Sequence, residues 1–469
     1  MLAVDEAHCV SQWGQDFRPG YLRIPAFVSK LKTRPVIGAF TATATGRVSE
    51  DIVKRLQLKN PLKITTGFDR PNLYFAVEHP ADRNARLLEL ISEREGLSGI
   101  IYCATRKNVE DVCLLLNEHG YPATRYHAGL SDDERRLNQD DFVYDRKPVM
   151  VATNAFGMGI DKSDVSYVIH YNMPKNIESY YQEAGRAGRD GSPAECILLY
   201  SPRDVVTNRF LIGSSEDNPE LTSDEREEVR RQDIGRLNRM TFYCITGDCL
   251  RGYILGYFGE QAPGRCGNCS NCLSDDDAVD VTDDAEKVIN CIAESGERFG
   301  TTVIVDTLRG KRNEKAERYG LLGLDCFGAL SDRDSAYIRS VIDLLLVKGI
   351  AVSEGEYPVL RLTEKGEKRD LDRLTLRITK KVKKKKAPKS AHGNADPELF
   401  AALRSLRTKL SAEEGVPPYF VFSDATLTDM AIKHPTTKEE FLSVSGVGNI
   451  KAQKYGEAFI SAIKNSPAK

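Results

Sequence analysis

Two adjacent carboxylates follow the first apolar run of the chain. Leu2-Ala3-Val4 is typical of a short strand, and Asp5-Glu6-Ala7-His8 comes directly after it. Ligands of parallel sheets bind at the carboxyl ends of strands, so Asp5 and Glu6 would face a ligand there. One carboxylate of such a pair can hold a Mg²⁺ ion that bridges phosphates, and the next can orient an attacking water. By itself the tetrapeptide is equally typical of an exposed acidic loop.

Two arginines stand three residues apart in the segment Gln182-Glu183-Ala184-Gly185-Arg186-Ala187-Gly188-Arg189. Gly185 and Gly188 permit a tight turn, on which both guanidinium groups can face one anion. A solvated basic turn would have the same composition, so the segment gains meaning only from its neighbours.

Four cysteines have the spacing of a metal site. Cys266, Cys269 and Cys272 follow one another at intervals of three on a loop rich in Gly and Asn, and sixteen residues separate Cys249 from Cys266. Four thiolates complete a tetrahedral Zn²⁺ site without an open position, which predicts a structural metal. Cys244, five residues before Cys249, could compete as the fourth ligand.

A polar loop rich in aromatic residues runs from Cys9 to Pro19. It holds the only Trp of the chain, Trp13, together with Ser11, Phe17 and Arg18. Such a loop offers a stacking surface for bases, although single tryptophans more often anchor a core.

The segment from Asp5 to Pro19 resembles motif II and the aromatic-rich loop of the RecQ family of DNA helicases, a superfamily 2 group. Later segments resemble motifs III to VI of that family in the same order, at residues 41–44, 99–106, 152–161 and 182–189. The resemblance implies an ATP-dependent enzyme that hydrolyses ATP and unwinds DNA in the 3′-to-5′ direction, in recombination, repair and replication. It also implies a nucleotide and Mg²⁺ between Asp5-Glu6 and the two arginines.

The same resemblance assigns further roles. Arg189 would be the arginine finger beside Arg186. His8 and Gln182 would join the catalytic set, and Gly157 and Asp161 the nucleotide-binding set. Ser11, Trp13, Phe17 and Arg18 would contact DNA, and Cys249 fits the RecQ zinc module better than Cys244.

Strand-like runs alternate with helical stretches from residue 36 to 200, which predicts an α/β fold with parallel sheets. We expect a partial and a complete RecA-like lobe, a helical zinc-binding module, a winged helix, a basic linker and a small all-α C-terminal domain. The expected ranges, in that order, are 1–66, 67–203, 204–275, 276–376, 377–394 and 395–469.

The two last domains are expected to bind DNA. Arg309 and Lys311 concentrate positive charge at a helix end of the winged helix, where phosphate contact is the natural use, although an ordinary charged helix end looks the same. Residues 396–464 resemble the helicase and RNase D C-terminal domain, which is an auxiliary DNA-binding module.

Composition excludes several classes of protein. The 66 basic and 68 acidic residues nearly cancel, so DNA affinity must come from local patches. Apolar runs are too short for a membrane span, and the scattered cysteines do not form a secreted disulfide framework. We expect a cytoplasmic protein, on the nucleoid if bacterial, that acts on single-stranded DNA and duplex junctions. The resemblance suggests a single-stranded-DNA-binding protein as partner, and the sequence does not indicate an oligomeric state.

One departure from the family concerns phosphate binding. RecQ-like helicases carry a Gly-x4-Gly-Lys-Ser/Thr loop ahead of motif II, whereas the one Gly-Lys pair of this sequence, Gly310-Lys311, is followed by Arg312. We therefore expect the chain to be the C-terminal part of a longer helicase. The alternative is a non-catalytic DNA-binding chain built from the zinc, winged-helix and C-terminal modules.

Overall fold

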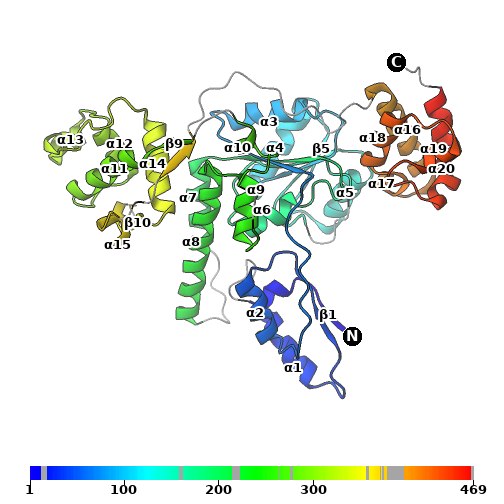
Figure 1. Cartoon of the computed structure of the whole chain (residues 1–469), viewed down its shortest axis with the longest axis horizontal. Coiled ribbons are helices and arrows are strands. Elements are labelled where there is room, and N and C mark those ends of the chain that lie inside the picture. Colours follow the sequence, from blue (N-terminus) through cyan, green and yellow to red (C-terminus); the bar gives the residue numbers. More distant parts are fainter. Residues whose placement is uncertain are drawn as a thin grey trace.

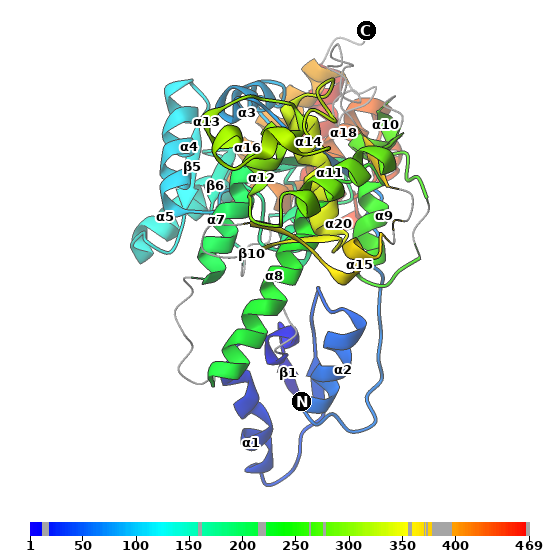
Figure 2. The same cartoon turned by 90° about the vertical axis from the view of Figure 1, so that its left-hand side faces the viewer.

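The computed structural model describes residues 1–11, 18–157, 162–213, 222–261, 264–274, 278–354, 359–369, 371, 374–377 and 396–465. A central body is flanked at its two ends by smaller units, and the N-terminal segment projects below it (Figure 1). Figure 2, turned by 90°, shows the same segment below the central body.

The N-terminal segment is a small α/β layer. Strands β1 (Leu2–Val4) and β2 (Ile37–Ala39) pair in parallel, beside helices α1 (Ile24–Ser29) and α2 (Gly46–Arg55). It has a small core of its own, formed by Val4, Ala7, Val10, Val48, Ile52 and Leu56. Two apolar side chains that flank β2, Val36 and Phe40, are 76% and 55% exposed.

The central body contains a six-stranded sheet in the order β3-β8-β7-β4-β6-β5, in which every neighbouring pair is parallel. Its strands are β3 (Leu73–Glu78), β4 (Gly99–Tyr102), β5 (Ala123–Tyr126), β6 (Val149–Ala152), β7 (Tyr167–His170) and β8 (Ala194–Leu199). The helices between them are α3 (Arg83–Ser92), α4 (Arg106–Glu118), α5 (Asp132–Val143) and α6 (Ile177–Ala184). Strands β4, β6 and β7 are buried at all four positions, as parallel strands covered on both faces must be. The parallel α/β lobe is therefore confirmed.

A helical module follows the sheet. It consists of α7 (Pro202–Gly213), α8 (Ser223–Ile245), α9 (Leu250–Tyr257) and α10 (Ser270–Leu273). A capping box between Thr222 and Glu225 starts the long helix α8. Buried residues of α8 and α9, including Met240, Tyr243 and Ile254, belong to the same hydrophobic cluster as Phe75 of the sheet.

The next unit has the helices and the β-hairpin of a winged helix, and a core of its own. Its main elements are α11 (Thr282–Glu294), α12 (Thr301–Leu308), α13 (Glu314–Arg318), α14 (Ser335–Val347), β10 (Ala351–Glu354) and β11 (Val359–Leu362), with α15 (Glu364–Glu367) after the hairpin. Strands β10 and β11 pair antiparallel, with Ala351 opposite Leu362. A second antiparallel pair joins β9 (Ala278–Asp280) to β12 (Thr375–Arg377).

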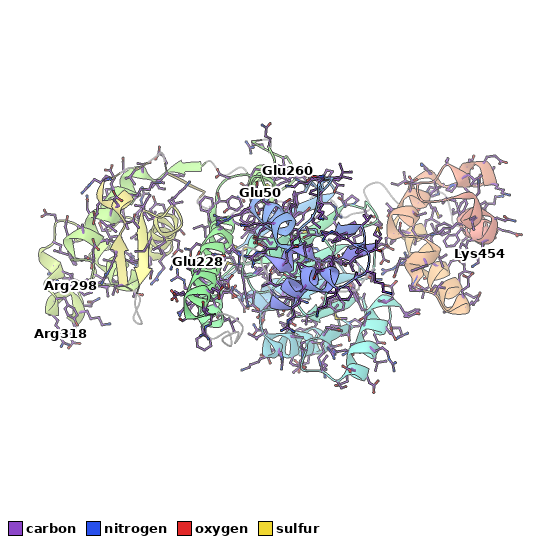
Figure 3. The ribbon with its side chains drawn as sticks, turned by 90° about the horizontal axis from the view of Figure 1, so that it is seen from below. Glu50, Glu228, Glu260, Arg298, Arg318 and Lys454 are labelled. Carbon is purple, nitrogen blue, oxygen red and sulfur yellow. The ribbon has the colours of Figure 1, made fainter. Side chains whose placement is uncertain are left out.

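The C-terminal unit is all-helical over its described residues, as expected. It comprises α16 (Pro397–Glu414), α17 (Pro418–Val421), α18 (Asp424–Lys433), α19 (Lys438–Leu442) and α20 (Asn449–Lys464) around a separate core. Seen from below, Arg298 and Arg318 of the winged helix and Lys454 of this unit lie at opposite ends of the molecule (Figure 3). Among the described residues, no helix is both long and apolar enough to cross a membrane.

Candidate nucleotide and zinc sites

The carboxylate pair lies at the carboxyl end of β1, as predicted. Glu6 adopts a left-handed backbone conformation with φ 46° and ψ 44°, and its N–H donates to Asp5 Oδ1 at 2.9 Å. A non-glycine residue in this region is strained, and such strain gathers at functional sites. The turn after the strand therefore holds the two carboxylates in a defined relation.

His8 connects the carboxylate pair to the segment that resembles motif III. Its Nδ1 atom lies 3.2 Å from Glu6 Oε2 and 2.9 Å from Thr41 Oγ1. The imidazole is 2% exposed, so these two neighbours fix its orientation. His8, which the family resemblance places in the catalytic set, thus positions Glu6 in this structure.

Gln182 and the two arginines come from the end of α6 and the turn after it. Asn176 caps this helix, because its side chain accepts a hydrogen bond from the Ser179 N–H at 2.7 Å. The helix ends at Ala184, and Arg186 and Arg189 follow within the turn 185–191, which we call the arginine turn.

Gln182 of the second lobe contacts the carboxylate pair of the N-terminal segment. Gln182 Nε2 donates to Glu6 Oε1 at 3.5 Å, across 176 positions of sequence. The contact joins the N-terminal segment to the second lobe at the carboxylate pair. The arginine turn begins three residues beyond Gln182 on the same lobe.

The Arg186 guanidinium group lies against Gly157 and has one nitrogen atom without an acceptor among the described residues. A Cβ atom at Gly157 would stand 2.5 Å from Arg186 Nη2, so a side chain there would displace the guanidinium group. Arg186 Nε is buried and has no acceptor among the described residues. A buried donor without an acceptor costs free energy, and a phosphate oxygen would satisfy it. Burial raises the pKa of the adjacent Tyr102 hydroxyl, and the Arg186 charge opposes that shift.

Other predicted residues lie apart from this contact or outside the description. Ser11 is fully buried, and Arg18 and Arg189 are exposed. Trp13, Phe17 and Asp161 lie outside the described residues. The DNA-contact role of the aromatic loop therefore stays a prediction.

The four predicted cysteine ligands converge. The Sγ atoms of Cys249, Cys266, Cys269 and Cys272 all lie within 4.8 Å of one another, and Cys244 is not among them. Cys266 Sγ and Cys272 Sγ are 3.9 Å apart, and a tetrahedron with Zn–S bonds of about 2.3 Å has edges of about 3.8 Å. The donor set and its dimensions therefore fit a structural Zn²⁺ ion.

Backbone N–H groups point at the sulfur atoms. Cys249 Sγ accepts from Gly252, Cys266 Sγ from Asn268 and Cys269 Sγ from Cys272, at 3.3 to 3.4 Å. Burial opposes ionisation of the Cys272 thiol, but backbone donors and neighbouring thiols lower its pKa to about 7. Burial raises the pKa of the Cys269 thiol to about 12 and also raises that of Cys249, so a bound Zn²⁺ ion would be needed to favour the thiolate form of these two ligands.

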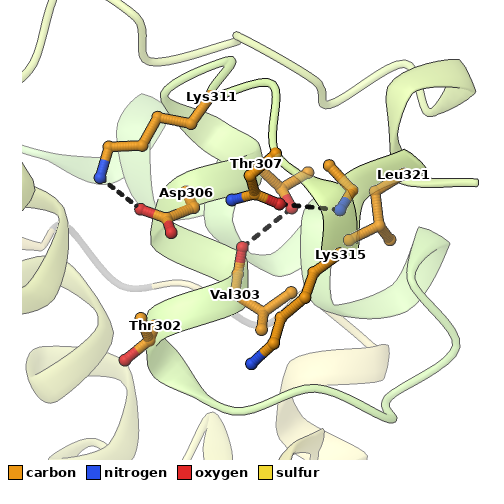
Figure 4. Close-up of a pocket in the computed structure, with 9 residues that line it drawn as sticks. Thr302, Val303, Asp306, Thr307, Lys311, Lys315 and Leu321 are labelled. Carbon is orange, nitrogen blue, oxygen red and sulfur yellow. Dashed lines mark hydrogen bonds and ion pairs between the residues drawn. The ribbon is translucent and has the colours of Figure 1, made fainter. Parts of the chain in front are cut away.

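The two basic residues predicted for DNA contact in the winged helix have partners within their own domain. Arg309 Nη1 donates to Ser335 Oγ at 3.0 Å, which ties the end of α12 to the start of α14. Lys311 Nζ lies 2.8 Å from Asp306 Oδ1 (Figure 4). The Lys311 side chain is half exposed and lines a small pocket with Thr302 and Lys315, so phosphate contact there stays a prediction.

Three residues outside the predicted site fix the arginine turn. Arg70 and Asn72 donate hydrogen bonds to its carbonyl groups, and Arg251 of α9 holds the backbone around them. The partners are more than 100 positions apart, and no local spacing marks them.

Comparison with known families assigns a description to each part of the chain. It matches the helicase conserved C-terminal domain over residues 82–191 and the RecQ zinc-binding model over residues 202–273. It also matches the RQC domain over residues 275–387 and the HRDC domain over residues 396–463.

Curated relatives match the chain along almost its whole length. The ATP-dependent DNA helicase RecQ of Bacillus subtilis is 43% identical over 99% of this chain and 76% of the relative. The proteins of the same name from Haemophilus influenzae and Pasteurella multocida are 38% and 37% identical, over 75% and 73% of their lengths. The chain thus spans about three quarters of these relatives.

Proposed function

Because the chain belongs to the RecQ family of ATP-dependent DNA helicases, we propose that it couples ATP hydrolysis to 3′-to-5′ unwinding of DNA during recombination and repair. The hydrogen bond between Gln182 and Glu6 carries this proposal, because it joins the carboxylate pair of one lobe to the helix that precedes the arginines of the other. The direction and the pathway rest on the family resemblance.

The residues on the two sides of this contact have complementary chemistry. Asp5 offers hard oxygen ligands for the Mg²⁺ ion of a bound nucleotide, and Glu6, held by His8 and Gln182, would orient the attacking water. Arg186 would donate to phosphate through its unpartnered Nε, and the exposed Arg189 would stabilise charge on the transferred group. ATP supplies the free energy, and the protein residues orient and bind it.

The zinc site, the RQC domain and the HRDC domain support DNA as the substrate. We propose that Arg18, with Trp13 and Phe17, couples DNA contact to the neighbouring carboxylates, since the loop follows them directly in sequence. A single-stranded-DNA-binding protein as partner and a nucleoid location belong to the same proposal and rest on the resemblance alone.

Hydrolysis of ATP by the 469-residue chain, with and without single-stranded DNA, tests the motor. We expect DNA to stimulate hydrolysis and Glu6→Gln or Arg189→Ala to lower kcat at least about 100-fold, the scale of lost catalytic groups. Arg136→Ala, which removes an exposed arginine of the same lobe, is the matched control. Equal rates for Glu6→Gln and the control would refute the assignment.

Strand displacement tests the direction. A duplex with a 3′ single-stranded tail should be unwound and one with a 5′ tail should not. Unwinding of the 5′-tailed duplex alone would reverse the proposed polarity while leaving the nucleotide site intact.

A further inference from the structure

We infer that Arg70 and Asn72 are positioning residues for the arginine turn, and that the zinc module holds them in place through Arg251 and Asn268. The inference rests on the proposed function for its meaning in catalysis. The hydrogen bonds that hold the backbone carbonyl groups of the turn can be tested separately from catalysis.

Arg70 and Asn72 bind the backbone of the arginine turn directly. Arg70 donates from Nη1 to the Gly185 carbonyl at 3.2 Å and from Nη2 to the carbonyls of Ala187 and Gly188 at 3.1 and 2.9 Å. Asn72 Nδ2 donates to the carbonyls of Gly188 and Ser192 at 2.9 and 2.8 Å. Two side chains therefore bind carbonyls on both sides of Arg186 and directly before Arg189.

The contact is close enough to dictate the residue at its centre. Gly188 has a φ of +56°, and a Cβ atom there would lie 2.5 Å from Asn72 Nδ2 and 2.6 Å from the Ser192 carbonyl oxygen. Only glycine accepts both the left-handed conformation and this approach. Because the backbone is fixed on either side of each arginine, the directions in which the two side chains leave it are fixed as well.

Two residues of the zinc module, Arg251 and Asn268, bind the backbone around Arg70 and Asn72. Arg251 Nη1 lies 2.7 Å from Asp69 Oδ1 and donates to the Arg70 carbonyl at 2.6 Å, and its Nη2 donates to the Leu73 carbonyl at 2.5 Å. Asn268 Nδ2 donates to the carbonyls of Pro71 and Leu73 at 3.1 and 3.2 Å. The backbone from 70 to 73 is thus bound on both sides of Asn72.

Arg251 and Asn268 both stand close in sequence to cysteines of the zinc site. Arg251 stands two residues after Cys249 on α9 and is 5% exposed. Asn268 lies between Cys266 and Cys269, and its own N–H donates to Cys266 Sγ. A bound Zn²⁺ ion would fix both positions, because it would hold the cysteines beside them. The cluster, residues 70–73 and the arginine turn therefore form one continuous chain of contacts.

Asn271 provides a matched control. It also lies between two cysteines, Cys269 and Cys272, and its Nδ2 makes two hydrogen bonds of 2.8 Å to backbone carbonyls. Those carbonyls belong to Thr246 and Asp248 of the zinc module itself, rather than to residues 70–73. Asn271→Ala and Asn268→Ala therefore each remove two amide hydrogen bonds to backbone carbonyls but differ in the target, and Asn271→Ala also removes the bond that Ser270 Oγ donates to Asn271 Oδ1 at 3.3 Å.

Amide hydrogen exchange and zinc content, measured on the whole zinc-loaded chain, test the inference. We expect Asn268→Ala, Arg70→Lys and Arg70→Ala to retain one zinc per chain and to raise exchange in residues 183–192 at least tenfold. The Gly188 amide, bonded to the Val165 carbonyl at 2.9 Å, is the most informative probe. Asn271→Ala should leave exchange there unchanged. Unchanged exchange in Arg70→Lys and Asn268→Ala would overturn the inference, even if Arg70→Ala fails to fold.

ATP hydrolysis provides the catalytic readout. Arg70→Lys should lower kcat about tenfold with KM for ATP changed less than twofold, because a displaced arginine loses contacts made mainly in the transition state. A rise in KM for ATP of about tenfold, with kcat unchanged, would overturn the positioning role. Altered exchange in a chain whose wild type does not hydrolyse ATP would refute the proposed function and leave the contact chain standing.

Discussion

The zinc module and the HRDC domain both pack on the second RecA-like lobe, but by different kinds of contact. The zinc module shares one hydrophobic cluster with the sheet, and Arg251 adds hydrogen bonds to backbone carbonyls and one ion pair with Asp69. The HRDC domain has its own core and meets the lobe through buried charges, among which Arg407 is fully buried.

The charged junction contains five groups. Lys162 Nζ lies 2.7 Å from Asp145 and 3.0 Å from Asp164 of the same lobe. Arg407 of α16 lies 2.7 Å from Asp424 of its own domain, 3.5 Å from Asp145 and 3.9 Å from Asp164.

The two kinds of contact differ in how readily water can replace them. Separation of the zinc module would expose a shared apolar core, which is costly at any pH. Separation of the HRDC domain would return charges to water, where hydration compensates much of the lost attraction. The zinc module is therefore part of the body of the lobe, whereas the HRDC domain is docked on it.

Removal of zinc should have the largest effect on the stability of the lobe and the zinc module. A structural zinc site contributes on the order of 10 kcal/mol to folding in small domains, and Cys269 is fully buried within the shared cluster. We expect chelation, or Cys269→Ser, to abolish the cooperative thermal transition of the lobe while the HRDC helices stay folded. Circular dichroism melts with parallel zinc analysis measure this. An unchanged melt after complete zinc loss would contradict the shared-core interpretation.

Arg407→Ala should have the next largest effect. It removes one of the two cations beside Asp145 and Asp164 and the cation paired with Asp424, and breaking a buried ion pair typically costs about 3–5 kcal/mol. Urea denaturation should show this loss in the transition of the HRDC domain, with the transition of the zinc module and lobe unchanged. A loss below about 1 kcal/mol would show that the charges are hydrated.

Acid should reduce the contribution of Asp145 to the free energy of unfolding. Burial acts to raise the pKa of this carboxyl, but Lys162 and Arg407 outweigh it and hold the pKa below its ordinary value. A carboxyl with a depressed folded-state pKa stabilises the fold above its unfolded pKa of about 3.9 and loses that contribution as pH falls through the folded value. The difference in unfolding free energy between wild type and Asp145→Asn should therefore shrink from pH 6 to pH 3. A constant difference would contradict the assigned charge state.

The smallest effect is expected for Arg404→Ala. Arg404 Nη1 donates to the Gly96 carbonyl at the edge of the HRDC junction, and this contact is exposed. Exposed polar contacts contribute about 0–1 kcal/mol, so urea denaturation should detect little change. A loss of unfolding free energy as large as that of Arg407→Ala would show that the exposed edge of the junction, rather than its buried charges, contributes most to its stability.

Local patterns of the sequence predicted the separate parts of the candidate site. The strand before Asp5 and the pitch of Cys266, Cys269 and Cys272 express short-range geometry, which sequence spacing records directly. The parallel second lobe followed from the alternation of strands and helices. The identity of the fourth cysteine did not follow from spacing, because Cys244 and Cys249 are both close enough in sequence, and only the fold separates them.

The residue types and the local turns can be read from the order of amino acids: the carboxylates after β1, the glycines of the arginine turn and the thiols of the zinc loop. Three long-range contacts become visible only in the folded chain: Gln182 meets Glu6, Arg251 binds the backbone beside Arg70, and Arg407 joins the charges around Lys162. The reason is that a hydrogen bond or an ion pair depends on distance and direction in space. Partners separated by more than 170 positions acquire both only when the intervening sheet and helices have packed.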